Sequence, residues 1–236
     1  YPVISVSLKG IDARSYEIAY QMAAQIIIEA AAKFYSLLES EKLNEHDKAV
    51  YRALLDKNMN EGMLCSSLRQ LSGMLEKHYG TKVIVLIDEY DVPLAKAHAN
   101  GYYAQMLSLI RSLLGEVLKT NSSLKLAVLT GCLIISKESI FTGLNNLKVL
   151  TIADERFDEY FGFTDKEVKD LLEYYGVMDH YEEVKRWYDG YQFGNAEVYC
   201  PWDVLNHCDR IRSAPHVQPE NYWINTSSND AVKRFI

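Results

Sequence analysis

Apolar residues along the first 160 positions alternate between short strand-like runs and longer stretches with helical spacing. The segment 3–8 alternates apolar residues with serines, which predicts a strand with one buried face. The run 83–87 is uninterrupted and mostly β-branched, a pattern typical of a parallel strand covered on both faces. Two further apolar runs predict strands at 124–129 and 147–152, with a polar loop between them.

The stretches between these runs have the spacing of amphipathic helices. Ser15 is placed to cap the first helix, and Gly80 follows the third, where a C-terminal cap belongs. Pro93 and Asn100 indicate a break before the next helix. The main apolar positions of the four predicted helices are Met22, Ile26, Phe34, Leu37 and Leu38; Ala49, Val50, Ala53 and Leu54; Leu64, Leu68, Leu71 and Leu75; and Met106, Ile110, Leu113 and Val117.

Strands separated by helical crossovers predict right-handed βαβ units, and therefore a mainly parallel α/β sheet with helices on both faces. The character of the chain changes near residue 164, where Thr164 and Glu167 form a capping box for a helix that runs to Gly176. The remainder is rich in Tyr, Trp, Asn and turn residues, which is typical of small helices and loops. We therefore expect an α/β domain over 1–158 and a mostly helical region over 159–236.

Composition excludes several classes of protein. The 236 residues carry 25 Lys and Arg against 32 Asp and Glu, and a net charge of −7 argues against broad binding to nucleic-acid phosphates. No apolar run approaches the roughly 20 residues of a membrane span. The four cysteines lie far apart without a C-x-x-C pair, so we expect reduced thiols in a cytoplasmic protein.

Six aromatic residues late in the chain raise the question of base stacking. They lack interleaved basic residues, so direct nucleic-acid binding by this segment is not expected. Packing of a helical lid against the α/β core is the favoured interpretation. The six residues are Trp187, Tyr188, Tyr191, Trp202, Tyr222 and Trp223.

The candidate chemistry lies where the apolar run 83–87 ends, at Asp88 and Glu89. Ligands of α/β proteins bind at the carboxyl ends of parallel strands. Asp88 suits Mg²⁺, which prefers oxygen ligands, and Glu89 suits polarisation of an attacking water in phosphoryl transfer. The alternative is that the pair only ends a strand and meets solvent or caps the next helix. The purely apolar run, followed at once by Asp91 and Pro93, favours the metal and hydrolysis interpretation.

The segment 88–94, Asp-Glu-Tyr-Asp-Val-Pro-Leu, resembles the Walker B signature of the bacterial AAA-ATPase-like family. Members are predicted P-loop ATPases, often followed by a PD-(D/E)XK nuclease-like domain. The resemblance spans essentially the whole chain in consistent order, and it implies a P-loop-type α/β core followed by a small, mostly helical C-terminal region. The other matching segments are 1–4, 129–131, 137–141, 143–147, 160–164, 187–191, 201–202 and 222–228.

The resemblance implies ATP and Mg²⁺ as cofactors and gives roles to individual residues. Asp88 would organise the magnesium ion, and Glu89 would be the catalytic glutamate. Thr130 would lie at the sensor position, where its hydroxyl contacts water or the terminal phosphate; a strand-end threonine without a ligand is an equal alternative. Asn145 is a candidate ligand contact, although fixing a loop by side-chain hydrogen bonds is the favoured interpretation. Lys137 either neutralises phosphate charge or, as is commoner, solvates the surface.

Two features depart from the family's pattern. Related sequences tend to carry an arginine a few residues after the Thr-Gly pair, where this chain has Ile134. The chain also contains no G-x-x-x-x-G-K-[ST] loop, whose backbone N–H groups and lysine grip the phosphates. In the family's order this Walker A loop and its central strand lie upstream of Tyr1. We therefore expect the chain to be a fragment that starts after them.

The resulting expectation is that the chain supplies the Walker B half of the site in an ATPase that hydrolyses ATP with Mg²⁺, and is inactive alone. The implied partners are ATP, a C-terminal nuclease-like domain and, as in AAA-type relatives, further copies in a homo-oligomer; no membrane partner is expected. The alternative is a degenerate, non-hydrolysing scaffold or protein-interaction module that regulates an attached nuclease-like domain. Ile134 would then be one symptom of the degeneration.

Overall fold

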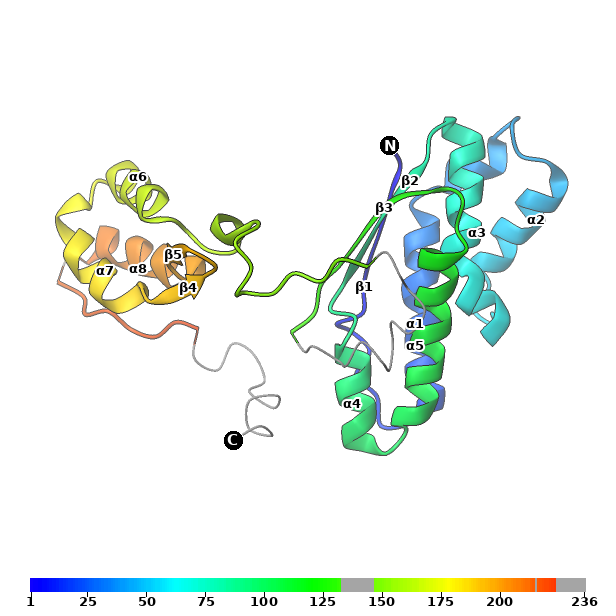
Figure 1. Cartoon of the computed structure of the whole chain (residues 1–236), viewed down its shortest axis with the longest axis horizontal. Coiled ribbons are helices and arrows are strands. Elements are labelled where there is room, and N and C mark those ends of the chain that lie inside the picture. The colour runs from blue at the N-terminus through cyan, green and yellow to red at the C-terminus, as the bar shows by residue number, and fades with distance from the viewer. Residues whose placement is uncertain (133–146, 215, 224–236) are drawn as a thin grey trace. The chain divides into compact units, whose positions relative to one another are not determined.

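The chain forms two compact units, Tyr1–Leu147 and Lys148–Ile236, each described here by itself (Figure 1). The sequence predicts a boundary later in the chain, between residues 158 and 159. In the structure, residues 148–158 belong to the second unit. The structure is a computed structural model that describes residues 1–132, 147–214 and 216–223.

The first unit is built on a three-stranded parallel sheet in the order β1-β2-β3. Strand β1 spans Val3–Ser7, β2 spans Val83–Asp88 and β3 spans Leu124–Leu129. All three were predicted, and their parallel pairing places every carboxyl end at the same edge of the sheet. The predicted fold class, a P-loop-like α/β sheet followed by a helical region, is confirmed.

Helices fill the connections between the strands, and their ends follow from local capping. The Ser15 hydroxyl accepts a hydrogen bond from the Ile18 amide at the start of α1, and Gly80 ends α3 in a left-handed conformation, both as predicted. The helix predicted over 15–38 is interrupted, because α1 stops at Ala32 and a short 3₁₀ helix follows. The elements are α1 (Tyr16–Ala32), the 3₁₀ helix Tyr35–Glu39, α2 (Glu45–Leu54), α3 (Glu61–Tyr79), α4 (Val92–Asn100) and α5 (Tyr103–Lys119).

One face of the sheet carries the core of the first unit. Its side chains are buried against α1, α3 and α5, which contact β1, β2 and β3 respectively (Figure 1). On the opposite face, Val3, Leu86, Leu126 and Val128 are 36–52% exposed. The prediction of helices on both faces is thus met on one side only within the described residues. The buried face consists chiefly of Ile4, Val6, Val83, Val85 and Ile87.

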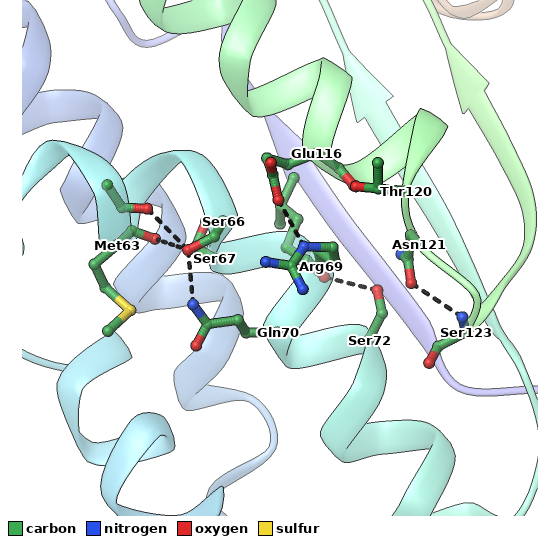
Figure 2. A network of polar contacts seen from close by, with 12 residues as sticks. Met63, Ser66, Ser67, Arg69, Gln70, Ser72, Glu116, Thr120, Asn121 and Ser123 are labelled. Carbon is green, nitrogen blue, oxygen red and sulfur yellow. Dashed lines mark hydrogen bonds and ion pairs between the residues drawn. The ribbon is translucent and has the colours of Figure 1, made fainter.

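Figure 2 shows polar contacts made by side chains of α3, one of which joins this helix to α5. Arg69 Nε donates to Glu116 Oε2 over 2.6 Å, which joins the two helices. The buried hydroxyls of Ser67 and Ser72 donate to carbonyl oxygens within α3. Because every one of these buried hydroxyls finds an acceptor inside its own helix, serine is tolerated on a face that packs into the core.

The prediction of a strand at 147–152 is wrong. These residues form no ladder, and Thr151 and Asp154 instead close a turn through two bonds to the Asp154 carboxylate. An apolar run becomes a strand only where a neighbouring strand pairs with its backbone. No described strand pairs with this run, and the side chains of Val149, Leu150 and Ile152 are exposed.

The second unit is mostly helical, as predicted. The Thr164–Glu167 capping box starts its first helix, and Gly176 ends that helix in a left-handed conformation. Its core is mainly apolar, and Asp203 and the wholly buried His207 are polar residues buried in the same unit. A two-stranded antiparallel hairpin, which the sequence analysis did not predict, lies between two helices. The elements are α6 (Asp165–Tyr175), α7 (Tyr181–Tyr188), β4 (Tyr191–Phe193), β5 (Ala196–Val198) and α8 (Pro201–Ser213), with 3₁₀ turns at Asp158–Tyr160 and Met178–His180.

The late aromatic residues divide into two groups. Tyr188 and Tyr222 pack in or against the core of the second unit, and the Tyr188 hydroxyl donates to the Glu220 carbonyl. The others, Trp187, Tyr191, Trp202 and Trp223, have about half of their surface exposed. Among the helices that the structure describes, none has the length and apolar character needed to cross a membrane.

Candidate functional site

The carboxyl ends of the three parallel strands bring three oxygen-bearing side chains to one edge of the sheet. Ser7 is the last residue of β1 and is paired in register with Asp88, the last residue of β2. Thr130 follows β3, and its amide donates to the Ile87 carbonyl over 2.9 Å. Backbone pairing therefore fixes Ser7 and Asp88, and a backbone hydrogen bond ties Thr130 to the end of β2.

Side-chain contacts gather around the Asp88 carboxylate. The Thr130 hydroxyl donates to Asp88 Oδ1, and the Ser7 hydroxyl lies 3.5 Å from Asp88 Oδ2. The Thr130 hydroxyl oxygen in turn accepts from the Glu89 amide over 3.3 Å. Thr130 is thus the group that joins the two acidic residues, through the side chain of one and the backbone of the other.

Glu89 has an unusual backbone conformation. Its φ of 52° lies in the left-handed region, which costs a residue with a Cβ about 1–2 kcal/mol. Its carboxylate lies 3.5 Å from the ammonium of Lys9, whose side chain is 75% exposed against 28% for Glu89. Ion pairs this exposed contribute little to stability. The strained backbone turns the side chain of Glu89 away from the direction that a continued strand would give it.

Negative charge is concentrated at this edge. Asp91 is 3% exposed and lies one turn beyond the acidic pair, at the start of α4. Burial first, and then the charges of Asp91, Glu89 and Asp88, raise the pKa of the Cys132 thiol above its usual range. Three carboxylates near one thiol make this edge electrostatically negative, which favours a cation.

The oxygen atoms at this edge fit a hard cation whose remaining coordination positions are filled by other ligands. Asp88, Ser7 and Thr130 offer only oxygen atoms, as Mg²⁺ prefers. Within the described residues, no three His, Cys, Asp or Glu side chains form a cluster that could hold a metal ion by themselves. Protein Mg²⁺ sites commonly use one or two carboxylates and draw the remaining ligands from water and substrate phosphates. Asp88 is the residue placed to be that carboxylate.

The structure brings together three of the four predicted site residues. Asp88, Glu89 and Thr130 lie at one edge, as the strand pattern predicted. The fourth, Asn145, lies outside the described residues, as do Lys137 and Ile134.

Two neighbours of the acidic pair were not singled out by sequence reasoning. They are Ser7 and Lys9, which contact Asp88 and Glu89 from the end of β1 and the residues just after it. Ser7 could have been found, because it ends a predicted strand that is parallel to 83–87. Lys9 carried no such signal, and the bond between Asp91 and Cys132 was not predicted either, since both contacts depend on loops whose course the pattern does not predict.

Comparisons with known proteins assign the chain to a family. The predicted AAA-ATPase family matches residues 1–141, and the chain belongs to that family. The sequence is 30% identical over 152 residues to an uncharacterized protein in the vnfD 5′ region of Azotobacter chroococcum mcd 1. That match covers 63% of this chain and 28% of the relative, so the chain spans well under half of the relative's length. No solved structure matches the chain.

Proposed function

We propose that this chain supplies the acidic, Walker B half of a site that binds and hydrolyses ATP with Mg²⁺. The observation that carries the proposal is the hydrogen-bonded group Asp88–Thr130–Glu89 at the carboxyl edge of a parallel sheet. This edge is the usual ligand position in α/β proteins. Membership of the predicted AAA-ATPase family supports the same substrate class.

In this proposal Asp88 holds the cation. When bound, Mg²⁺ neutralises phosphate charge and orients the phosphates for in-line attack. The Thr130 hydroxyl donates to one oxygen of Asp88 and the Ser7 hydroxyl lies beside the other, so the carboxylate is held in one orientation. A preoriented carboxylate loses less conformational entropy when it takes up its ligand.

Glu89 is the general base in this proposal. Its backbone turns away from the strand, so its carboxylate and that of Asp88 serve different partners. A carboxylate that orients and deprotonates the attacking water contributes about two to four orders of magnitude to a rate. The Lys9 ammonium, 3.5 Å from the Glu89 carboxylate, lies in exposed surroundings where solvent weakens the pairing.

The test is Glu89→Gln in the full-length protein that contains this sequence. The amide keeps the size and the hydrogen-bonding oxygen but cannot take a proton at neutral pH. We expect ATP to bind with nearly unchanged affinity while turnover falls by about two to four orders of magnitude. Glu41→Gln, at an exposed glutamate outside the strand edge, is the matched control and should leave turnover unchanged. Equal turnover in Glu89→Gln and wild type would show that Glu89 is not the base.

The partners belong to the same proposal. By its family resemblance, the parent protein carries a C-terminal nuclease-like domain and assembles into a homo-oligomer in the cytoplasm. Light scattering of the full-length protein with and without ATP measures the assembly, and a monomer under both conditions would contradict it. If the wild-type protein binds no nucleotide in the presence of Mg²⁺, the non-hydrolysing scaffold is the better interpretation.

A further inference from the structure

The Asp91 side chain bridges two turns that are far apart in sequence. Asp91 is the N-cap residue of α4, and its backbone carbonyl accepts from the amides of Leu94 and Ala95. Its side chain makes no capping bond to its own helix. Instead, Asp91 Oδ2 accepts from the Cys132 amide over 3.0 Å, across 41 positions. A carboxylate only 3% exposed is thus used to hold the segment that follows β3.

Gly131 shows how closely this contact is fitted. A Cβ added at Gly131 would lie 2.8 Å from Asp91 Oδ1 and 2.8 Å from Tyr90 Cε1. Atoms do not approach this closely without displacement of one partner. The backbone φ of Gly131 is ordinary, so the glycine is needed for space and not for conformational freedom. The turn after β2 and the segment after β3 therefore pack in direct contact at this point.

Thr130 lies inside the same contact. Its amide donates to the Ile87 carbonyl over 2.9 Å and its carbonyl accepts from the Tyr90 amide over 3.1 Å. Its hydroxyl meets Asp88 and the Glu89 amide. The pairing of β2 with β3 ends at Ile87 and Leu129. The position of Thr130 is therefore set by its own hydrogen bonds and by the contacts that hold the residues after it.

We infer that Asp91 is a positioning residue, which fixes the 130–132 segment and thereby holds the Thr130 hydroxyl between Asp88 and Glu89. The effect on turnover rests on the proposed function, since the positioned hydroxyl matters to turnover only if the site hydrolyses ATP. The claim that Asp91 holds the 130–132 segment rests on the contacts alone. Asp91 would thus act through Thr130 and without touching the substrate.

Amide hydrogen exchange tests the structural content without reference to activity. In Asp91→Ala, we expect the Glu89 and Tyr90 amides, which donate to Thr130, to exchange at least about tenfold faster than in wild type. The Leu94 and Ala95 amides donate to the backbone carbonyl of residue 91 and should exchange as before. Asp91→Asn keeps an acceptor oxygen for the Cys132 amide and should stay within about threefold of wild type.

Gly131→Ala tests the same contact from the other side and should reproduce the faster exchange at Glu89 and Tyr90. Gly115→Ala is the matched control, because a Cβ there meets nothing within 4 Å. Unchanged exchange of Glu89 and Tyr90 in Asp91→Ala would overturn the inference. Equal acceleration of Leu94 and Ala95 would also overturn it, because Asp91 would then only start the helix.

Turnover of ATP by the full-length protein separates this inference from the proposed function. Absence of turnover in the wild type contradicts the proposed function and leaves the exchange result to decide the role of Asp91. With an active wild type, we expect turnover at least about tenfold lower in Asp91→Ala and rescue by Asp91→Asn. Full turnover in Asp91→Ala would overturn the inference.

Discussion

The Thr130 hydroxyl donates a hydrogen bond to the Asp88 carboxylate, although the two residues are 42 positions apart. The bond crosses between the ends of two neighbouring parallel strands, where their backbone pairing has just ended. It orients the acidic side chain before any ligand arrives. This contact is the structural reason to regard the strand ends as a preorganised site and not as a chance group of polar residues.

Substitution of Thr130 measures the value of this bond. Thr130→Val keeps the shape but leaves Asp88 Oδ1 and the Glu89 amide without their partner, whereas Thr130→Ser keeps the hydroxyl. We expect the free energy of unfolding to fall by about 1 kcal/mol in the valine variant and by less in the serine variant. Urea denaturation provides the measurement. Equal stability of the two variants would show that the hydroxyl contributes nothing.

The left-handed backbone of Glu89 predicts that a glycine variant is more stable than an alanine variant at this position, the reverse of the order inside a helix. At φ 52°, a Cβ is strained, so Glu89→Gly should be more stable than Glu89→Ala by about 1 kcal/mol. Both variants lose the Lys9 contact, which therefore cancels in the comparison. At Gln21, an exposed position inside α1, the alanine variant should instead be the more stable. Thermal or urea unfolding of the four variants measures both differences. A glycine variant at position 89 that is less stable than the alanine variant would contradict the left-handed backbone.

The Asp165 carboxylate makes the second unit sensitive to acid. Hydrogen bonds from Lys169, Tyr181 and Tyr199 lower the pKa of Asp165 below its usual range. A lowered folded-state pKa gives stability that is fully present above the unfolded pKa, about 3.9, and is lost as the pH falls through the folded value.

Asp165→Asn removes this dependence. The difference in unfolding free energy between wild type and Asp165→Asn should be largest near neutral pH and should shrink as the pH falls below about 4. Denaturation at a series of pH values measures it. Asp170→Asn, an exposed carboxylate on the same helix, is the control. A difference that stays constant down to pH 2 would mean that Asp165 is not held as the anion.

The cysteines should differ widely in reactivity. Cys208 is wholly buried, and burial raises the pKa of its thiol to about 11. Cys132 is exposed, although partial burial of its thiol and then the nearby carboxylates raise its pKa as well. Since the thiolate is the nucleophile, we expect Cys132 to react first with a thiol reagent and Cys208 only on unfolding. Mass spectrometry of peptides after timed alkylation gives the order, and early labelling of Cys208 would contradict its burial.

Local signals in the sequence were sufficient for most of the first unit and for the start of α6 in the second. Three strands, the Ser15 and Gly80 caps and the Thr164–Glu167 capping box follow from residue type and spacing, and all are present. The acidic pair could be placed for the same reason, because a parallel strand has to deliver its last residues to the edge where ligands bind.

The misses have physical causes. Pro93 suggested a break, but proline is tolerated in the first turn of a helix, where its missing N–H would have had no partner, and α4 begins there. The 147–152 run has strand composition but pairs with none of the described strands. Strands β4 and β5 have three residues each, too few to show an alternation. The contact from Asp91 to Cys132 joins two loops, and spacing along one chain carries no information about such a contact.

Calorimetric titration of ATP into the full-length protein, with and without Mg²⁺, tests the central claim most directly. We predict binding that Mg²⁺ strengthens in the wild type, and loss of that strengthening in Asp88→Asn while the fold is retained. Binding of ATP that is the same with and without Mg²⁺, or an Mg²⁺ effect that survives in Asp88→Asn, would contradict the assignment of the strand edge as the cation half of a nucleotide site.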